Sequence, residues 1–492
     1  MFEFFFNPLI VLICLPLFGI FVLLIFIPET ENHFLKIFTL VITSLTFIWS
    51  LCIWINFNET TSNFQFLETY SLIPFFNISY SIGIDGISLL FLLLSTFLIN
   101  LCILISWEFP KFFIKEYLIS FLFLEFCLIQ IFCVLDILLF YIFFESVLIP
   151  MFLIIGIWGS RERKIRAAFQ FFLYTLIGSL FMLVGIIFIY SIKGTTDLQI
   201  LWFTDFPLNI QLILWILFFL GFSVKIPMVP FHIWLPEAHA EAPTAGSVIL
   251  AGILLKLGGF GFLRFSLPLF PFASLFFSPF VFVLSLIAII YASLTTLRQI
   301  DLKKIIAYSS ISHMGFVTLG IFSLTLNGID GSIMLMLSHG LISSAMFFCI
   351  GILYDRYSTR ILKYFGGLVQ IMPIFVIFFM FFSFSNISFP GTSSFIGELL
   401  ILSGISKISL CLVSLALFGV VLSASYAIWL FNRVSFGLLH LHYFTYFQDI
   451  SRREFFILSL LTFSVFLLGI YPEIFLNDLN FSSLSLFKHL IY

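Results

Sequence analysis

Six ionisable side chains interrupt long apolar runs of this 492-residue sequence. They are two acids, two lysines and two histidines: Glu145, Glu398, Lys225, Lys256, His313 and His339. An acid or a lysine at the centre of a bilayer costs about 2.5–3.5 kcal/mol on insertion scales. Burial favours the neutral form of both, so groups placed there can take up and release protons near neutral pH, and histidine does so unperturbed. We therefore predict that these six residues carry protons through a membrane.

A break in a membrane-spanning helix is predicted directly after Lys225. Three prolines follow that residue: Pro227, Pro230 and Pro236. Each proline removes an N–H group and clashes with the preceding turn. Broken backbone at membrane depth is tolerated only where it is buried in protein or lines a hydrated cavity. His232 and His239 fall in this break, where they either transfer protons, with a weaker claim than the six residues above, or only satisfy the carbonyls that the break frees.

A second break is predicted at 386–394, with the sequence NISFPGTSS, and Glu398 lies just beyond it. Paired broken segments in the two halves of a transporter indicate inverted repeats with ion sites near the midplane. An ionisable residue accompanies both breaks, which favours this interpretation. The alternative is that Pro390 and Gly391 only kink or end a helix.

Each buried ionisable residue also has a structural alternative. His313 and His339 could be hydrogen-bonding struts between helices, or axial ligands of a haem in an electron carrier. Glu145 could be a static partner of one lysine. Glu125 is a further acid within an apolar run, but no partner or role for it is predicted.

The composition identifies the elements that must position these groups. The chain is 62% hydrophobic and 9% charged, against about 25% charged in soluble domains. At about 20 residues per span, it is predicted to be an all-α integral membrane protein with about fourteen transmembrane helices. No basic patch indicates nucleic-acid binding, and the seven cysteines are scattered without a C-x-x-C pair, so no iron–sulfur or zinc site is predicted.

The distribution of basic residues predicts the orientation of the chain. Sixteen of the 22 lysines and arginines, Lys303 and Arg360 among them, fall in loops after odd-numbered spans; four, including Arg264, fall on the other side and two lie within spans. The positive-inside rule then places both termini on the outer side. The N-terminus lacks the basic region of a signal peptide, and the 73 phenylalanines are typical of an AT-rich genome. Synthesis inside an organelle is therefore expected.

Several segments resemble the antiporter-like membrane-arm subunits of respiratory complex I. They are FFESVLIPMFLIIGIWG, KIPMVPFHIWLPEAHAEAPTAGSVILAGILLKLGGFGFLR, LRQIDLKKIIAYSSISHMGF, LSHGLISSAMFF and FIGELLIL. The resemblance implies helices 1–3 over residues 1–115, two inverted five-helix repeats over 116–267 (helices 4–8) and 268–433 (helices 9–13), and a loop with helix 14 over 434–492. Helices seven and twelve would be discontinuous.

The resemblance also implies a role for each residue. Glu145 and Lys225 would form a gating ion pair, and Lys256 would connect the two halves. His313 and His339 would line the hydrated axis, and Glu398 would be the terminal proton carrier.

The function implied is proton translocation within NADH:ubiquinone oxidoreductase of the mitochondrial inner membrane, with both termini in the intermembrane space. Expected partners are other membrane-arm subunits, including neighbouring antiporter-like subunits, and membrane lipids. This chain would bind no cofactor, because NADH, FMN, the Fe–S clusters and ubiquinone would bind partner subunits. A stand-alone monovalent cation/proton antiporter and a quinone-binding subunit are the alternatives.

Overall fold

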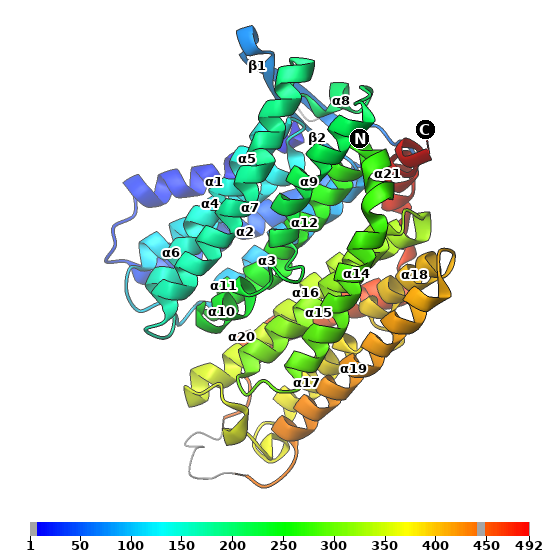
Figure 1. Cartoon of the computed structure of the whole chain (residues 1–492). Coiled ribbons are helices and arrows are strands. Elements are labelled where there is room, and N and C mark those ends of the chain that lie inside the picture. Colours follow the sequence, from blue (N-terminus) through cyan, green and yellow to red (C-terminus); the bar gives the residue numbers. More distant parts are fainter. Residues whose placement is uncertain (1–6, 440–447, 492) are drawn as a thin grey trace. The chain divides into compact units, whose positions relative to one another are not determined.

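The computed structural model describes residues 7–439 and 448–491, most of which are helical (Figure 1). Thirteen helical segments of this part are long and apolar enough to cross a membrane. These segments are α1 Pro8–Ile25, α2 Asn32–Ile55, α3 Gly86–Ile105, α4 Ile114–Cys133, α5–α6 Ile137–Trp158, α7 Lys164–Lys193, α9 Leu208–Lys225, α11–α13 Thr244–Leu269, α14 Pro271–Thr296, α15 Leu302–Phe322, α16 Leu326–Tyr357, α19 Leu410–Ser435 and α20 Arg452–Ile470. The short apolar helices α17 (Pro373–Asn386) and α18 (Ser393–Ser406) supply the remaining span, so the prediction of about fourteen spans is confirmed.

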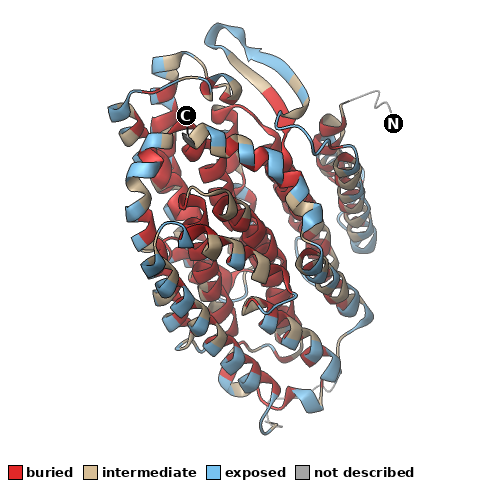
Figure 2. Ribbon diagram, turned by 90° about the vertical axis from the view of Figure 1, so that its right-hand side faces the viewer, coloured by how far each residue is buried: buried red, intermediate tan, exposed pale blue. Residues whose placement is uncertain are grey.

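The chain divides into two compact units, each described here by itself. Unit 1 comprises the described residues of 1–225, 260–276 and 477–492, and unit 2 those of 226–259 and 277–476. In unit 1, α7 packs along α9, and α1 packs against α2 and α4. In unit 2, α16 packs along α15 and α18. Almost all residues of α15 and α16 are buried, and Figure 2 distinguishes such helices in red from those with exposed, pale blue faces.

Both predicted helix breaks are confirmed. Helix α9 ends at Lys225, turns occupy most of residues 226–233, and the short helix α10 covers Trp234–Glu241. Helix α17 ends at Asn386 and α18 begins at Ser393. Between them Gly391 has a φ of 92°, a conformation that a residue with a Cβ atom rarely adopts. The inverted repeats and the four predicted domains stay predictions.

Two glycines allow α16 and α18 to approach closely in unit 2. A Cβ atom on Gly331 would lie 2.7 Å from the backbone nitrogen of Ile401, and one on Gly397 would lie 2.8 Å from that of Leu335. Small residues permit such backbone contact between transmembrane helices. This close packing holds Glu398, the neighbour of Gly397, in the interior of the unit.

Serine hydroxyls in the buried helices donate hydrogen bonds to carbonyls of their own helix. Ser309 and Ser310 both donate to the Ile306 carbonyl, at 2.8 and 3.0 Å. Ser343 donates to the His339 carbonyl at 2.6 Å. Such local bonds satisfy the hydroxyl without a partner on another helix.

A two-stranded antiparallel hairpin between α2 and α3 was not predicted. Strand β1 covers Gln65–Ile73 and strand β2 covers Ile78–Ile84, joined by the 3-10 turn η1 at Pro74–Phe76. The segment is rich in the aromatic and β-branched residues that favour strands.

A helix after the last span was also not predicted. Helix α21 (Glu473–Ile491) follows Pro472, which ends the preceding apolar pattern. Asp478 of this helix is 3% exposed, and its Oδ2 accepts a hydrogen bond of 2.7 Å from Trp54 Nε1. Burial raises the pKa of Asp478 to about 6, an effect that the Trp54 bond opposes and the nearby Glu59 reinforces.

The raised pKa of Asp478 predicts pH-dependent stability. The folded state binds this proton more tightly than the unfolded state, so the contribution of Asp478 to stability is most favourable below pH 3.8 and is lost as the pH rises through about 6. An Asp478→Asn variant should therefore gain up to about 3 kcal/mol at pH 8, the value of about two pKa units at about 1.4 kcal/mol each, and nothing at pH 3.5. Thermal unfolding of the purified protein at both pH values measures this. A gain of equal size at both would contradict it.

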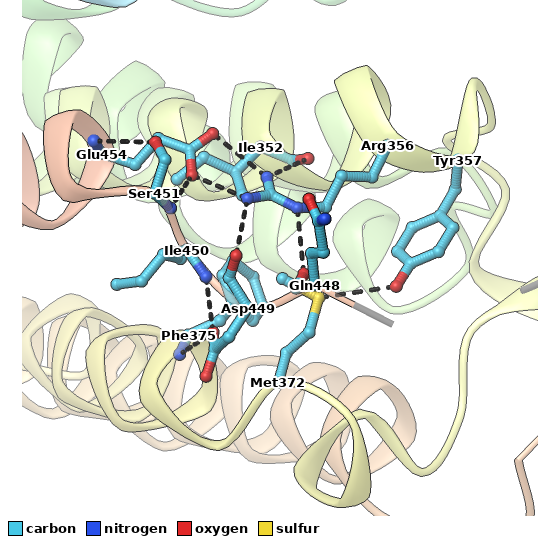
Figure 3. A network of polar contacts seen from close by, with 10 residues as sticks. All are labelled: Ile352, Arg356, Tyr357, Met372, Phe375, Gln448, Asp449, Ile450, Ser451 and Glu454. Carbon is cyan, nitrogen blue, oxygen red and sulfur yellow. Dashed lines mark hydrogen bonds and ion pairs between the residues drawn. The ribbon is translucent and has the colours of Figure 1, made fainter. Parts of the chain in front are cut away.

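A polar network ties the end of α16 to the start of α20 in unit 2 (Figure 3). The Arg356 guanidinium donates to both carboxylate oxygens of Glu454, at 3.1 and 2.7 Å. It also donates to the carbonyls of Ile352, Gln448 and Asp449. A bidentate arginine–carboxylate pair with further carbonyl acceptors fixes both helix ends.

Candidate functional site

Glu145 and Lys225 lie near each other in unit 1. Glu145 is in the last turn of α5 (Ile137–Ser146), and Lys225 ends α9. Lys225 is 2% exposed; its Nζ donates to the Phe144 carbonyl at 3.3 Å and lies 4.0 Å from the centroid of the Phe144 ring. The two charges interact electrostatically. Among the ion pairs of the described residues, none joins them.

A kink beside Glu145 explains its place at a helix end. Val147 separates α5 from α6 (Leu148–Trp158). Pro150 has no N–H to donate to the carbonyl of Ser146, and its ring crowds that carbonyl. One buried carboxylate oxygen of Glu145 lacks a hydrogen-bond partner among the described residues. The carboxylate therefore has an acceptor site to offer to a lysine or to water.

Four titratable side chains on four helices form a continuous row in unit 2. Lys256 Nζ lies 2.8 Å from His339 Nδ1, and the rings of His339 and His313 are 5.6 Å apart between centroids. His313 Nδ1 lies 3.3 Å from Glu398 Oε1. Lys256 is on α12 (Leu255–Gly261), His339 on α16, His313 on α15 and Glu398 on α18. All four are at most 5% exposed.

A π-helical turn precedes the lysine of this row. The turn η2 covers Leu250–Leu254, within the span that carries Lys256. The i→i+5 bonding of such a turn adds a residue and displaces a carbonyl from its usual partner; π turns are frequent at functional sites. Lys256 Nζ donates to the Ala251 carbonyl at 2.5 Å. The turn thus supplies an acceptor that holds the ammonium group beside His339.

A cavity of about 10 Å³ lies beside the two histidines. Its lining includes His313, His339 and, from the helix ends that flank the second break, Ser385, Asn386 and Ser394. This volume is at the lower limit for one water molecule, and the polar lining can bind it. His313 Nε2 has no hydrogen-bond partner among the described residues. The helix ends at the second break therefore supply polar lining to a cavity next to the row.

The two weaker histidine candidates lie apart from the direct contacts of the row. His239 is fully buried and stacks on Phe347 with 4.7 Å between centroids, and neither ring nitrogen bonds to any described residue. His232 is 7% exposed, and its ring lies 5.8 Å from that of Tyr291. His239 therefore does not satisfy carbonyls at the break. His232 is hydrogen-bonded to the backbone of Pro230 within the break, as the structural alternative expects of it.

Two buried cations that sequence analysis placed in loops bind the carbonyls at the end of α10. Lys303 Nζ donates to the Ala242 carbonyl at 2.7 Å, and the Arg360 guanidinium donates to the Ala240 carbonyl. Both cations are at most 2% exposed. Cations are favoured at the negative end of a helix dipole, so they stabilise the broken helix. The residues next to Lys303 and Arg360 in the sequence did not indicate that these cations are buried.

A third cation placed in a loop is also buried. Arg264 in unit 1 forms a bidentate pair with Asp85, at 2.9 and 2.7 Å. Asp85 also accepts from the Ser88 backbone N–H as the N-cap of α3. Glu125, for which no partner was predicted, accepts a 2.6 Å hydrogen bond from Thr46. The described residues contain no cluster of three or more His, Cys, Asp or Glu that could hold a metal.

The fold and the site define a helical membrane protein with many spans, two interrupted helices and a buried row of titratable groups. Residues 134–423 match the model of the NADH:quinone oxidoreductase/Mrp antiporter transmembrane family. The chain belongs to this family.

Similar proteins agree with the assignment. NADH-ubiquinone oxidoreductase chain 4 of Chondrus crispus is 64% identical over 483 residues, covering 98% of each chain. Its counterpart in Marchantia polymorpha is 57% identical and covers 99% of this chain and 98% of the other. A chain of respiratory complex I from Thermus thermophilus is 27% identical, with a TM-score of 0.89. The match covers 98% of this chain and 99% of the other. A chain of the Mrp complex from Dietzia shares the fold, with a TM-score of 0.83 at 18% identity. The match covers 98% of this chain and 55% of the other.

Proposed function

We propose that this chain is a proton-translocating membrane subunit of NADH:ubiquinone oxidoreductase in the mitochondrial inner membrane, with both termini in the intermembrane space. One observation carries the proposal: the buried row Lys256–His339–His313–Glu398. Intramembrane ionisable groups that pair in the protein interior mark proton relays. Glu145 and Lys225 would provide the corresponding pair in unit 1.

The redox chemistry belongs to other subunits in this proposal. NADH, FMN, Fe–S clusters and ubiquinone would bind there, and this chain would move protons without a cofactor of its own. Its partners would be other membrane-arm subunits, including antiporter-like neighbours, and lipids. The identity to chain 4 of Chondrus crispus over nearly the full length supports this placement.

The energies involved are compatible with the geometry. Moving one proton against 100 mV costs about 2.3 kcal/mol. Two unit charges 4 Å apart interact with about 4 kcal/mol at an effective dielectric constant of about 20. Movement of the Lys225 ammonium group from the Phe144 carbonyl toward Glu145 would change the energy of the pair by a similar order. A partner subunit that drives this movement could therefore drive the proton.

The row is tested by a His313→Gln variant in the assembled complex. Glutamine keeps a hydrogen-bonding group beside Glu398 but cannot carry a proton. We expect NADH-driven proton translocation in vesicles to fall about tenfold, the effect of about 1.4 kcal/mol. His33→Gln, at an exposed position outside the row, should leave the rate unchanged. Equal translocation by the His313 variant and the parent would refute the relay.

Membership of a complex is tested separately. After mild solubilisation, the chain should migrate with an NADH-oxidising assembly on a native gel. If the chain instead migrated by itself and exchanged cations for protons in vesicles, it would be a stand-alone antiporter.

A further inference from the structure

A pocket of about 390 Å³ opens in unit 1. It is lined by the loop 202–206 with Gln211 of α9, by Pro268, Leu269 and Pro271 at the junction of α13 (Leu267–Leu269) and α14, and by Lys488 and His489 of α21. The loop precedes the span α9, and the junction links two further spans. The pocket therefore lies where transmembrane helices end, at the level of phospholipid headgroups.

Charged and polar groups of the pocket lack partners within the chain. The side chains of Lys488 and Asp205 line it, and no hydrogen bond or ion pair of either side chain occurs among the described residues. Gln211 is 8% exposed, and its Oε1 has no hydrogen-bond partner there. Trp202 Nε1 also lacks one. Lys488 and Asp205 thus offer an exposed donor and an exposed acceptor, and Trp202 Nε1 and Gln211 Oε1 are a buried donor and a buried acceptor of residues in the wall.

The charges of the residues that line the pocket balance at neutral pH. His489 packs against Trp202 with 5.4 Å between ring centroids, and burial lowers the pKa of His489. This ring is therefore neutral at pH 7. Among the lining residues one cation, Lys488, and one anion, Asp205, remain, and the Lys193 ammonium group next to them is held on the Asp205 carbonyl. A net anionic headgroup would meet the Asp205 carboxylate, whereas a zwitterionic headgroup matches both charges.

The pocket wall is fixed in place. Lys193, the last residue of α7, donates to the Asp205 carbonyl at 2.8 Å and lies 4.9 Å from the Phe206 ring centroid. Gln211 Nε2 donates to the Phe206 carbonyl at 3.0 Å. Phe203 is 84% exposed and Leu208 is 53% exposed beside this wall. Exposed apolar side chains at a headgroup site are suited to contact acyl chains.

We propose that this pocket binds a phospholipid whose headgroup carries a primary ammonium group, as in phosphatidylethanolamine. The lipid phosphate accepts hydrogen bonds from Lys488 and Trp202. The ammonium group donates to Asp205 and Gln211. Phosphatidylcholine has a quaternary ammonium group with no N–H to donate, so it leaves both acceptors unsatisfied.

The test uses the intact complex in phosphatidylcholine nanodiscs. These contain trace phosphatidylethanolamine or phosphatidylcholine with the same photoreactive acyl chain, and the labelled peptides are quantified by mass spectrometry. At residues 193–211 and 473–491, labelling by the ethanolamine probe should exceed that by the choline probe about tenfold, the factor for 1.4 kcal/mol. Asp205→Asn should remove this preference, and Lys488→Gln should weaken labelling by both probes.

Matched controls are Glu473→Gln and Lys407→Gln, which change an exposed acid and an exposed lysine outside the pocket. Both should label as the parent does. Equal labelling of the parent by the two probes would overturn the proposal. So would stronger labelling by a phosphatidylglycerol probe, an unaltered preference in Asp205→Asn, or no labelling at all, as expected if a partner subunit fills the pocket.

Discussion

Replacing Glu145 with glutamine is expected to lower redox-driven proton translocation about 10²-fold, the lower part of the range for a positioned proton-transfer group. Glutamine matches glutamate in size and keeps an acceptor at the kink after Ser146. It cannot take up a proton, and it leaves the Lys225 ammonium group without its electrostatic partner. Proton translocation is measured in vesicles with the assembled complex, alongside NADH oxidation.

The matched control is Glu125→Gln. Glu125 is also a buried acid of unit 1, 1% exposed, and it accepts a hydrogen bond from Thr46 that glutamine can also accept. This variant should pump at the parent rate, because no hydrogen bond or ion pair between described residues joins Glu125 to any of the six. If both variants lost pumping equally, a general effect of buried acids on assembly would explain the result. Full pumping by Glu145→Gln would exclude a transfer role for Glu145.

Lys256→Met is expected to lower proton translocation by a similar factor of about 10². Methionine follows the course of the lysine stem but carries no proton. It also leaves His339 Nδ1 and the Ala251 carbonyl without the donor that binds both. An unpaired buried polar group costs about 1–3 kcal/mol, so a lower thermal unfolding temperature should accompany the lost pumping.

The control for this substitution is Lys115→Met. Lys115 also donates to backbone carbonyls, those of Leu24 and Ile27, but it lies outside the row. It should lose some stability without losing proton translocation. Lys256→Gln separates the two effects further, since glutamine can donate a hydrogen bond and cannot carry a proton. Restored stability without restored pumping is the expected result, and restored pumping would contradict the relay.

The residues of the row and the two breaks could be predicted because their signals are local. A lysine or an acid in an apolar run has few structural uses, so Lys225, Lys256 and Glu398 were recognisable one by one. Prolines likewise mark a break wherever the fold places it. Which side chains lie next to one another in the folded row was less predictable. The contact of His339 with Lys256 joins residues 83 apart in sequence.

Other parts of the site depend on distant segments and gave no signal. Asp85 and Arg264 are 179 residues apart, and Arg264 looked like a loop residue because it stands near the end of its span. Lys303 and Arg360 were assigned to loops for the same reason. Only the position of α10 shows that these cations bind its final carbonyls. The π-helical turn before Lys256 has no sequence signature comparable to proline.

The serine hydroxyls that bond within α15 and α16 bear on how the protein is made. A nascent span enters the bilayer before the neighbours that will surround it are complete. A hydroxyl already bonded to a carbonyl of its own helix, such as that of Ser310 or Ser343, imposes little penalty at that stage. Lys256 can also use the carbonyl of Ala251 in its own span. Polar helices of this kind can therefore enter the bilayer one at a time and pack against each other afterwards.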